Sequence, residues 1–140
     1  MFETLGVAVD ETWLQAAGEH VRDRLGQDLA IFVVDADDRG LAACAAGTIA
    51  RRLPTPPNPS GLVGYVQWVS TDPGERRRGH ARAVMDALLN WYAGRDVRSV
   101  ELHATPEGEP LYRSQGFSDS GGGKALRRRP WGQAVAGAGR

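Results

Sequence analysis

The chain has 140 residues, 41% hydrophobic and 24% charged, which is enough apolar material for the core of one globular domain but not of two. Its 17 basic and 17 acidic side chains give a formal net charge of zero, so no overall field favours binding to nucleic acid or to an anionic membrane. A single cysteine, Cys44, excludes an internal disulfide, and His20, His80 and His103 lack metal-ligand spacing, so we expect no metal. The absence of an apolar 18-residue stretch and of a signal-peptide pattern favours a cytoplasmic protein.

The first part of the chain predicts one helix and a pair of strands. Apolar residues recur at helical spacing after Asp10, which can cap a helix, so we expect a helix over residues 11–25 that ends at Gly26. An almost fully apolar run at residues 29–34 and its hairpin partner at residues 41–51 predict two antiparallel strands.

The middle of the chain predicts a strand, a helix and a second strand. A surface loop rich in proline covers residues 54–61, after which residues 63–69 return to a strand pattern. An amphipathic helix is expected over residues 79–93 and another strand over residues 97–104. Because a connection of this length forms a right-handed parallel crossover, the helix should lie on one face of the sheet.

The last part of the chain predicts a short helix and two further strands. Pro110 suits the first turn of the helix, Phe117 should enter the next strand, and residues 124–129 are expected to form the last strand. We therefore expect a single domain over residues 1–130, followed by a mobile tail at residues 131–140.

The turn before the long helix has the features of a phosphate-binding loop. Three arginines at residues 76–78 precede Gly79, and the small Gly79 and Ala81 let successive main-chain N–H groups approach a pyrophosphate. The helix N-terminus adds roughly +0.5 of a unit charge. Three arginines alone are usually a solvated turn, but the glycine and the helix that follow favour an anion site.

Two motifs together resemble the GNAT acetyltransferase superfamily. Residues 76–81, Arg-Arg-Arg-Gly-His-Ala, match its R/QxxGxG/A signature, and residues 111–117, Leu-Tyr-Arg-Ser-Gln-Gly-Phe, are similar to its LYxxxGF segment. They stand in the usual order and at the usual separation, so the resemblance covers roughly residues 10–130. It implies an α/β (α+β) fold with a mixed, splayed sheet, helices on both faces, and acetyl-CoA between the parallel strands at residues 63–71 and 97–104.

The resemblance also implies roles for particular residues. Val69 and Thr71 would offer backbone groups to the pantetheine and acetyl end of acetyl-CoA, and Arg76 would help to organise the turn. The residues expected around the pyrophosphate are Arg77, Arg78, Gly79, His80, Ala81 and Arg82. The chemistry of the family is direct attack of an amine on the thioester in a ternary complex, with a backbone N–H stabilising the oxyanion.

Tyr112 and Glu101 are the catalytic candidates. Tyr112 looks like the general acid of the family, and a phenol with a pKa of about 10 can protonate a departing thiolate of about 8.5 when the two are held together. An alkyl ammonium must lose a proton before it attacks, so a base or a water chain is needed. Glu101 and His103 should share one face of a strand beside the site, and Glu101 is the first candidate base. The alternatives are a core role for Tyr112 and a structural role for the Glu101 and His103 pair.

Two features depart from the family pattern. The asparagine that often follows the second parallel strand is replaced by Thr-Pro-Glu-Gly-Glu at residues 105–109. Residues 1–7 look like the end of the first helix of the family, so its first strand is expected to be missing. The strand at residues 29–34 would then have an open edge, covered by a partner chain in a homodimer or by residues upstream.

The sequence predicts an N-acetyltransferase that uses acetyl-CoA and a small-molecule or peptide amine. The two departures favour, as the alternative, a catalytically weak domain that binds or senses acyl-CoA. A nucleic-acid-binding module built on the arginines at residues 51–52, 76–78 and 127–129 is a third hypothesis. The zero net charge and the lack of an aromatic stacking pattern count against it.

Overall fold

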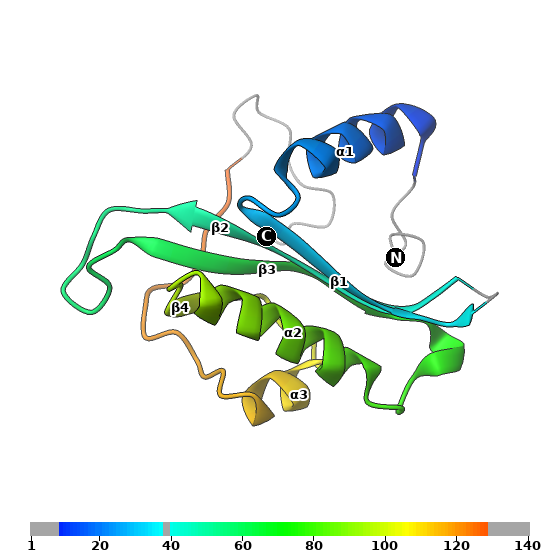
Figure 1. Cartoon of the computed structure of the whole chain (residues 1–140). Helices are drawn as coiled ribbons and strands as arrows, with labels where there is room; N and C mark the ends of the chain where they lie inside the picture. Colours follow the sequence, from blue (N-terminus) through cyan, green and yellow to red (C-terminus); the bar gives the residue numbers. More distant parts are fainter. Residues whose placement is uncertain (1–8, 38–39, 129–140) are drawn as a thin grey trace.

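The computed structural model describes residues 9–37 and 40–128, which form a four-stranded sheet in the order β1-β2-β3-β4 with helices on both faces (Figure 1). The elements are α1 (Glu11–Arg24), β1 (Leu29–Asp35), β2 (Leu41–Arg51), β3 (Leu62–Thr71), the 3-10 helix η3 (Pro73–Glu75), α2 (His80–Gly94), β4 (Ser99–Glu101) and α3 (Glu109–Ser114). Strands β1, β2 and β3 are antiparallel, whereas β3 and β4 are parallel. The expected mixed α/β fold is confirmed.

Helix α1 begins and ends where its sequence signals indicate. The Asp10 carboxylate accepts a hydrogen bond of 2.7 Å from the main-chain N–H of Trp13, which caps the helix. Gly26 follows with a φ of +83°, a left-handed conformation that turns the chain into β1. Helix α1 lies on the face of the sheet opposite α2, and none of its residues is buried (Figure 1).

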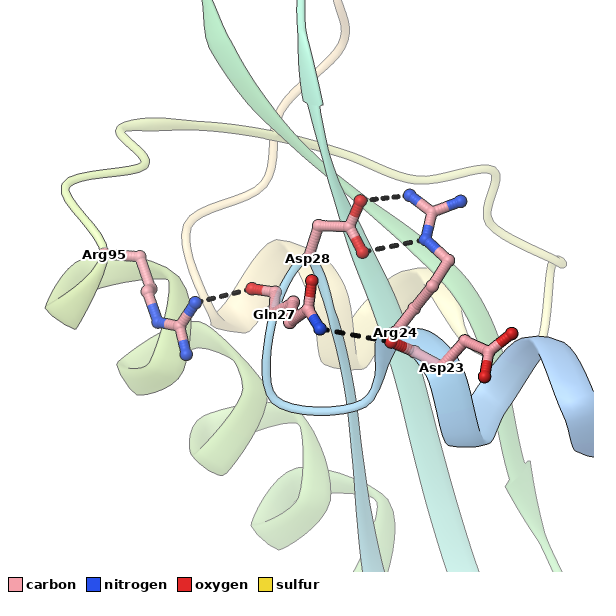
Figure 2. A network of polar contacts seen from close by, with 5 residues as sticks. All are labelled: Asp23, Arg24, Gln27, Asp28 and Arg95. Carbon is pink, nitrogen blue, oxygen red and sulfur yellow. Dashed lines mark hydrogen bonds and ion pairs between the residues drawn. The ribbon is translucent and has the colours of Figure 1, made fainter.

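The turn after α1 is fastened to the C-terminal end of α2 (Figure 2). The guanidinium of Arg95 donates to the carbonyl oxygens of Gln27 at 2.5 Å and Gly26 at 2.6 Å. Across the same turn Arg24 pairs with Asp28, and the hydrogen bonds between them raise the pKa of Arg24 and lower that of Asp28. These contacts fix the point at which β1 begins.

The hydrophobic core lies between the sheet and α2. Helix α2 contributes the largest fully buried side chains, Met85, Leu88 and Tyr92. They pack on small residues of β2 such as Ala43 and Ala45, so the helix axis can approach the sheet closely.

Tyr92 fixes the position of α2 along the sheet. Its hydroxyl donates to the carbonyl oxygens of Thr48 at 3.2 Å and Tyr65 at 3.0 Å, and burial raises its pKa far above the ordinary value. Glycines make room for the ring, since a Cβ at Gly64 would lie 2.6 Å from Tyr92 Cε1 and one at Gly47 would lie 2.1 Å from the hydroxyl. The N-terminus of α2 is thereby held beside the end of β3.

Three predicted strands differ from the structure. Strand β4 spans three residues, not the eight of residues 97–104, because β3 offers it a partner only at residues 63–65. The strands expected from Phe117 and over residues 124–129 are wrong, since residues 117–128 contain no strand. A glycine triplet at residues 121–123 interrupts this segment, and no strand of the described sheet pairs with it.

Other expectations fall partly outside the described residues. The helix end expected at residues 1–7 and the tail at residues 131–140 lie there. Within the described ranges β1 pairs with β2 alone and so forms an edge of the sheet, and the homodimer expected to cover it stays a prediction. None of the described helices has the length and apolar character needed to cross a membrane. The cytoplasmic location also stays a prediction.

Candidate active site

Strands β3 and β4 pair briefly and then separate. The last pair joins Tyr65 to Glu101, after which β3 runs on to Thr71. Gln67 has no partner in the register between β2 and β3, so a β-bulge lies just beyond the last pair. In the described sheet, the edge of β3 past Tyr65 faces no strand, and its main-chain groups border an open fork.

A cleft of about 840 Å³, here called the main cleft, lies at this fork. Its walls are residues 69–71 of β3, residues 75–77 and 79–82 at the start of α2, residues 105–108, and Leu111 and Tyr112 of α3. The main cleft thus gathers every residue expected from the sequence to contact acetyl-CoA except Arg78.

Within the described part of the chain, main-chain donors at the turn before α2 have no partner and can bind an anion. Arg77 and Gly79 have φ values of +64° and +78°, and a Cβ at Gly79 would meet no atom within 4 Å. Glycine at position 79 therefore allows the left-handed backbone, and its lack of a side chain leaves the adjacent space open. Among the described residues no side chain caps α2, and Ala83 N–H makes the first helical bond, to the Gly79 carbonyl at 3.0 Å. The N–H groups of the first three helical residues precede that bond.

Glu75, which the sequence analysis did not single out, braces this turn. It is buried, with 4% of its surface exposed, and its Oε2 lies 3.1 Å from Arg78 Nη1 and 3.6 Å from His80 Nε2. Arg78 and His80, on either side of Gly79, thus contact one buried carboxylate, while Arg76 lines the main cleft. The expected role of Arg76 in organising the turn stays a prediction. The available sequence signal was an acidic residue directly before three arginines, which a buried counter-charge explains.

Hydrogen bonds tie α3 to α2. Arg82 Nη2 donates to Ser114 Oγ at 2.8 Å, and Gln115 Nε2 donates to Asp86 Oδ1 at 2.8 Å. Both bonds join the N-terminal half of α2 to the end of α3, the helix that carries Tyr112. The catalytic candidate is thus held in place by the same helix that begins at the turn.

Tyr112 is half-buried in the wall of the main cleft. Its ring packs edge-to-face on Phe117, with 6.1 Å between ring centres, and Gly108 leaves room for it because a Cβ there would lie 2.9 Å from Cε2. Burial raises the pKa of Tyr112, so the phenol keeps its proton at neutral pH. None of the described residues bonds to its hydroxyl.

A second cavity of about 490 Å³ lies between β4 and the segment after α3. Its walls are residues 100–104, Glu109, Tyr112, Arg113, residues 117–120 and Ala125. Glu101 lines this second cavity, and both of its carboxylate oxygens accept hydrogen bonds from Arg52, at 3.0 and 3.1 Å. His103 lines it too, with Nδ1 2.8 Å from the hydroxyl of Tyr65. The structure brings Glu101 and His103 together, as expected, but not into the main cleft.

Solved structures share this fold. A predicted acetyltransferase from Clostridium acetobutylicum, solved with acetyl-CoA, has a TM-score of 0.74 and 24% identity over 87% of this chain and 79% of its own. A GCN5-related N-acetyltransferase from Ralstonia eutropha JMP134 has a TM-score of 0.66 and 26% identity over 86% of this chain and 82% of its own.

The aminoglycoside N-acetyltransferase AAC(6')-Iy, solved with a bisubstrate analogue, has a TM-score of 0.72 and 21% identity over 92% of this chain and 87% of its own. No curated protein matches the sequence. Residues 1–117 match the model of the acetyltransferase (GNAT) family, which is well over half of the chain. The chain therefore belongs to the GNAT family of acetyltransferases.

Proposed function

We propose that this protein transfers an acetyl group from acetyl-CoA to the amine of a small molecule or peptide. One observation carries the proposal: the main cleft joins the unpaired edge of β3, the uncapped N-terminus of α2 and the half-buried Tyr112. These three features offer a partner for an extended amide chain, a site for a diphosphate and a proton donor.

Acetyl-CoA fits the donors that line the main cleft. Its pantetheine arm is an extended chain with two amides, which can bond to the free edge of β3 around Val69 and Thr71. Its diphosphate can accept hydrogen bonds from main-chain N–H groups at residues 77–82, where the helix terminus adds positive potential. Arg76, Arg77 and Arg82 supply full charges near the same place.

The proposed reaction is attack of a neutral amine on the thioester carbon. A main-chain N–H of β3 near the fork stabilises the oxyanion, and the thiolate leaves with the proton of Tyr112. Tyr112 suits this role because burial keeps its phenol protonated while its hydroxyl stays unbonded among the described residues. Glu101 remains the base that the sequence alone suggests.

A domain that binds acyl-CoA without efficient turnover is the second candidate. It is favoured by the ion pair that occupies both oxygens of Glu101 and by the replacement of the expected asparagine at residues 105–109. The two functions differ in turnover and not in cofactor binding.

An assay of thiol release over a panel of amines separates the two candidates. The panel should hold monoamines, polyamines, aminoglycosides and peptides with a free amino group, and calorimetry should measure the affinity for acetyl-CoA in parallel. The transferase proposal predicts binding together with release of CoA that depends on one class of amine. Binding without release for any amine would favour the sensing domain, and no binding would refute both.

A further inference from the structure

We infer that His103, and not Glu101, is the base that takes the proton from the acceptor amine, which enters through the second cavity. The inference rests on the proposed acetyl transfer and names the missing proton acceptor. It starts from the position of Tyr112, which is the one described residue that lines both the main cleft and the second cavity.

The proton donor must lie against the sulfur of the thioester, so the reacting carbon has to sit close to Tyr112. Acetyl-CoA accounts for the main cleft, whose lining holds the turn before α2. An amine that approaches Tyr112 from the other side passes through the second cavity. Its nitrogen then meets the side chains that β4 and its continuation present there, among them Glu101 and His103.

Glu101 is already engaged. Arg52 donates one hydrogen bond to each carboxylate oxygen, at 3.0 and 3.1 Å, in a bidentate geometry between two half-exposed side chains. A proton taken up by this carboxylate would neutralise its charge and so weaken the pair with Arg52. No described residue restrains the Nε2 of His103 in a comparable way.

His103 is oriented through one nitrogen and free at the other. Its Nδ1 lies 2.8 Å from the Tyr65 hydroxyl, and the two rings meet edge-on at 5.8 Å. If Nδ1–H donates to the Tyr65 oxygen, Nε2 keeps its lone pair and can accept a proton. Of the described residues, none bonds to Nε2.

His103 is exposed, and charged groups from several elements line the same cavity, most of them in ion pairs. Glu101 of β4 is held by Arg52, while Arg113 of α3 donates to Glu109 and Asp119. The remaining titratable neighbours are the phenols of Tyr65 on β3 and Tyr112 on α3. His103 is thus a proton acceptor in the second cavity that forms no ion pair with any of the described residues.

The proposed proton transfers balance. Nε2 of His103 takes one proton from the acceptor ammonium, and the neutral amine forms a bond to the thioester carbon while the carbonyl electrons move to oxygen. When these electrons return, the carbon–sulfur bond breaks and the thiolate takes the proton of Tyr112. The extra proton on the new amide nitrogen passes to the Tyr112 oxygen, and His103 releases its own to water.

The test compares four variants over pH 5.5–9.5, with the best amine from the panel. His103→Gln should lower kcat by about 100-fold or more and abolish the acidic limb of the pH profile of kcat/KM, with acetyl-CoA affinity unchanged. Glu101→Gln and the control His20→Gln, an exposed position on α1, should keep that limb. Tyr65→Phe should lower kcat by less, because it removes only the orienting bond. The inference would be overturned if the acidic limb of the pH profile persisted in His103→Gln or disappeared in Glu101→Gln.

A second readout does not need turnover. Correlation of ring nitrogens with ring protons by NMR, in protein saturated with acetyl-CoA, should show the proton of neutral His103 on Nδ1 and none on Nε2. The opposite tautomer would overturn the role of His103 even in an active enzyme. Inactivity toward every amine would instead refute the proposed transferase, so the two failures can be told apart.

Discussion

The hydroxyl of Tyr112 is the residue-scale feature on which turnover depends in this account. Tyr112→Phe keeps the ring, its edge-to-face contact with Phe117 and the packing against Gly108. We therefore expect kcat to fall by about 100-fold or more while the affinity for acetyl-CoA changes by less than about twofold. Steady-state kinetics with calorimetry checks this, and a variant as fast as the parent would exclude Tyr112 as the acid.

The raised pKa of Tyr112 also sets the sign of its pH effect. A phenol whose pKa lies above the ordinary value of about 10 stays protonated across the neutral range. Its ability to donate a proton is lost only as the pH rises through that raised pKa. The pH profile of the parent should therefore show no fall in kcat from this group between pH 7 and 9.

The sequence predicted most of the lining of the main cleft, but not how its turn is held. Gly79, His80 and Ala81 are consecutive in the sequence, and the helix pattern that follows them is a local signal. Their position at the N-terminus of α2 could therefore be predicted. Which arginine turns away from the cleft depends on the left-handed backbone at Arg77 and on the buried Glu75. Neither can be predicted from a local pattern, because the burial of Glu75 depends on the rest of the fold and arginine is not a residue type that favours a left-handed backbone.

Among the elements, the packing of α2 on the sheet depends on Gly47 and Gly64, which leave room for the side chain of Tyr92. In Gly64→Ala the new methyl group would lie 2.6 Å from the ring of the fully buried Tyr92. We expect a loss of about 1–3 kcal/mol in the free energy of unfolding, measured by urea denaturation.

Gly94→Ala is the matched control for this change, because a Cβ there meets no atom within 4 Å. It should leave stability unchanged or raise it by up to about 1 kcal/mol, since alanine favours a helix over glycine. Equal effects of the two substitutions would contradict the packing argument.

The link between the α1–β1 turn and the end of α2 gives a second prediction at this scale. Arg95→Ala removes two hydrogen bonds to main-chain carbonyls and the contact of the guanidinium with the Trp91 ring, 5.1 Å from its centre. We expect a loss of about 1 kcal/mol.

Hydrogen exchange should locate that loss, with faster exchange at the start of β1. Arg98→Ala is the control, because its ion pair with Asp96 is largely exposed and should contribute little. Unchanged exchange at β1 in Arg95→Ala would show that the bonds in Figure 2 do not hold the turn.

Elements with strong local signals were predicted closely, and elements defined by their partners were not. Asp10 caps α1 and Pro110 stands in the first turn of α3, as expected, because caps and prolines act on their own neighbours. Residues 97–104 have the composition of a long strand, yet β4 ends at Glu101 where β3 diverges. Strand length is a property of the pair, so one sequence cannot reveal it.

In the molecule as a whole, helix α2 connects the fork between β3 and β4 to the turn that borders the main cleft and to α3, which carries Tyr112. Helix α2 begins at the turn that borders the main cleft, is seated on the sheet by Tyr92 and holds α3 through Arg82 and Asp86. The parallel crossover that the sequence predicted produces this arrangement, since it sets the N-terminus of α2 beside the open end of β3 (Figure 1). The fork itself followed only from the family resemblance.

A calorimetric titration of acetyl-CoA into the parent, Gly79→Asp and Gly74→Asp tests whether the start of α2 binds the diphosphate. Each variant adds one carboxylate where a Cβ meets no atom within 4 Å, but Gly79 lines the main cleft and has a left-handed φ of +78°, whereas Gly74 does neither. If main-chain amides at the start of α2 hold the diphosphate, Gly79→Asp should weaken binding by at least about tenfold and Gly74→Asp by less than about twofold. Parent-like affinity in Gly79→Asp would contradict the account.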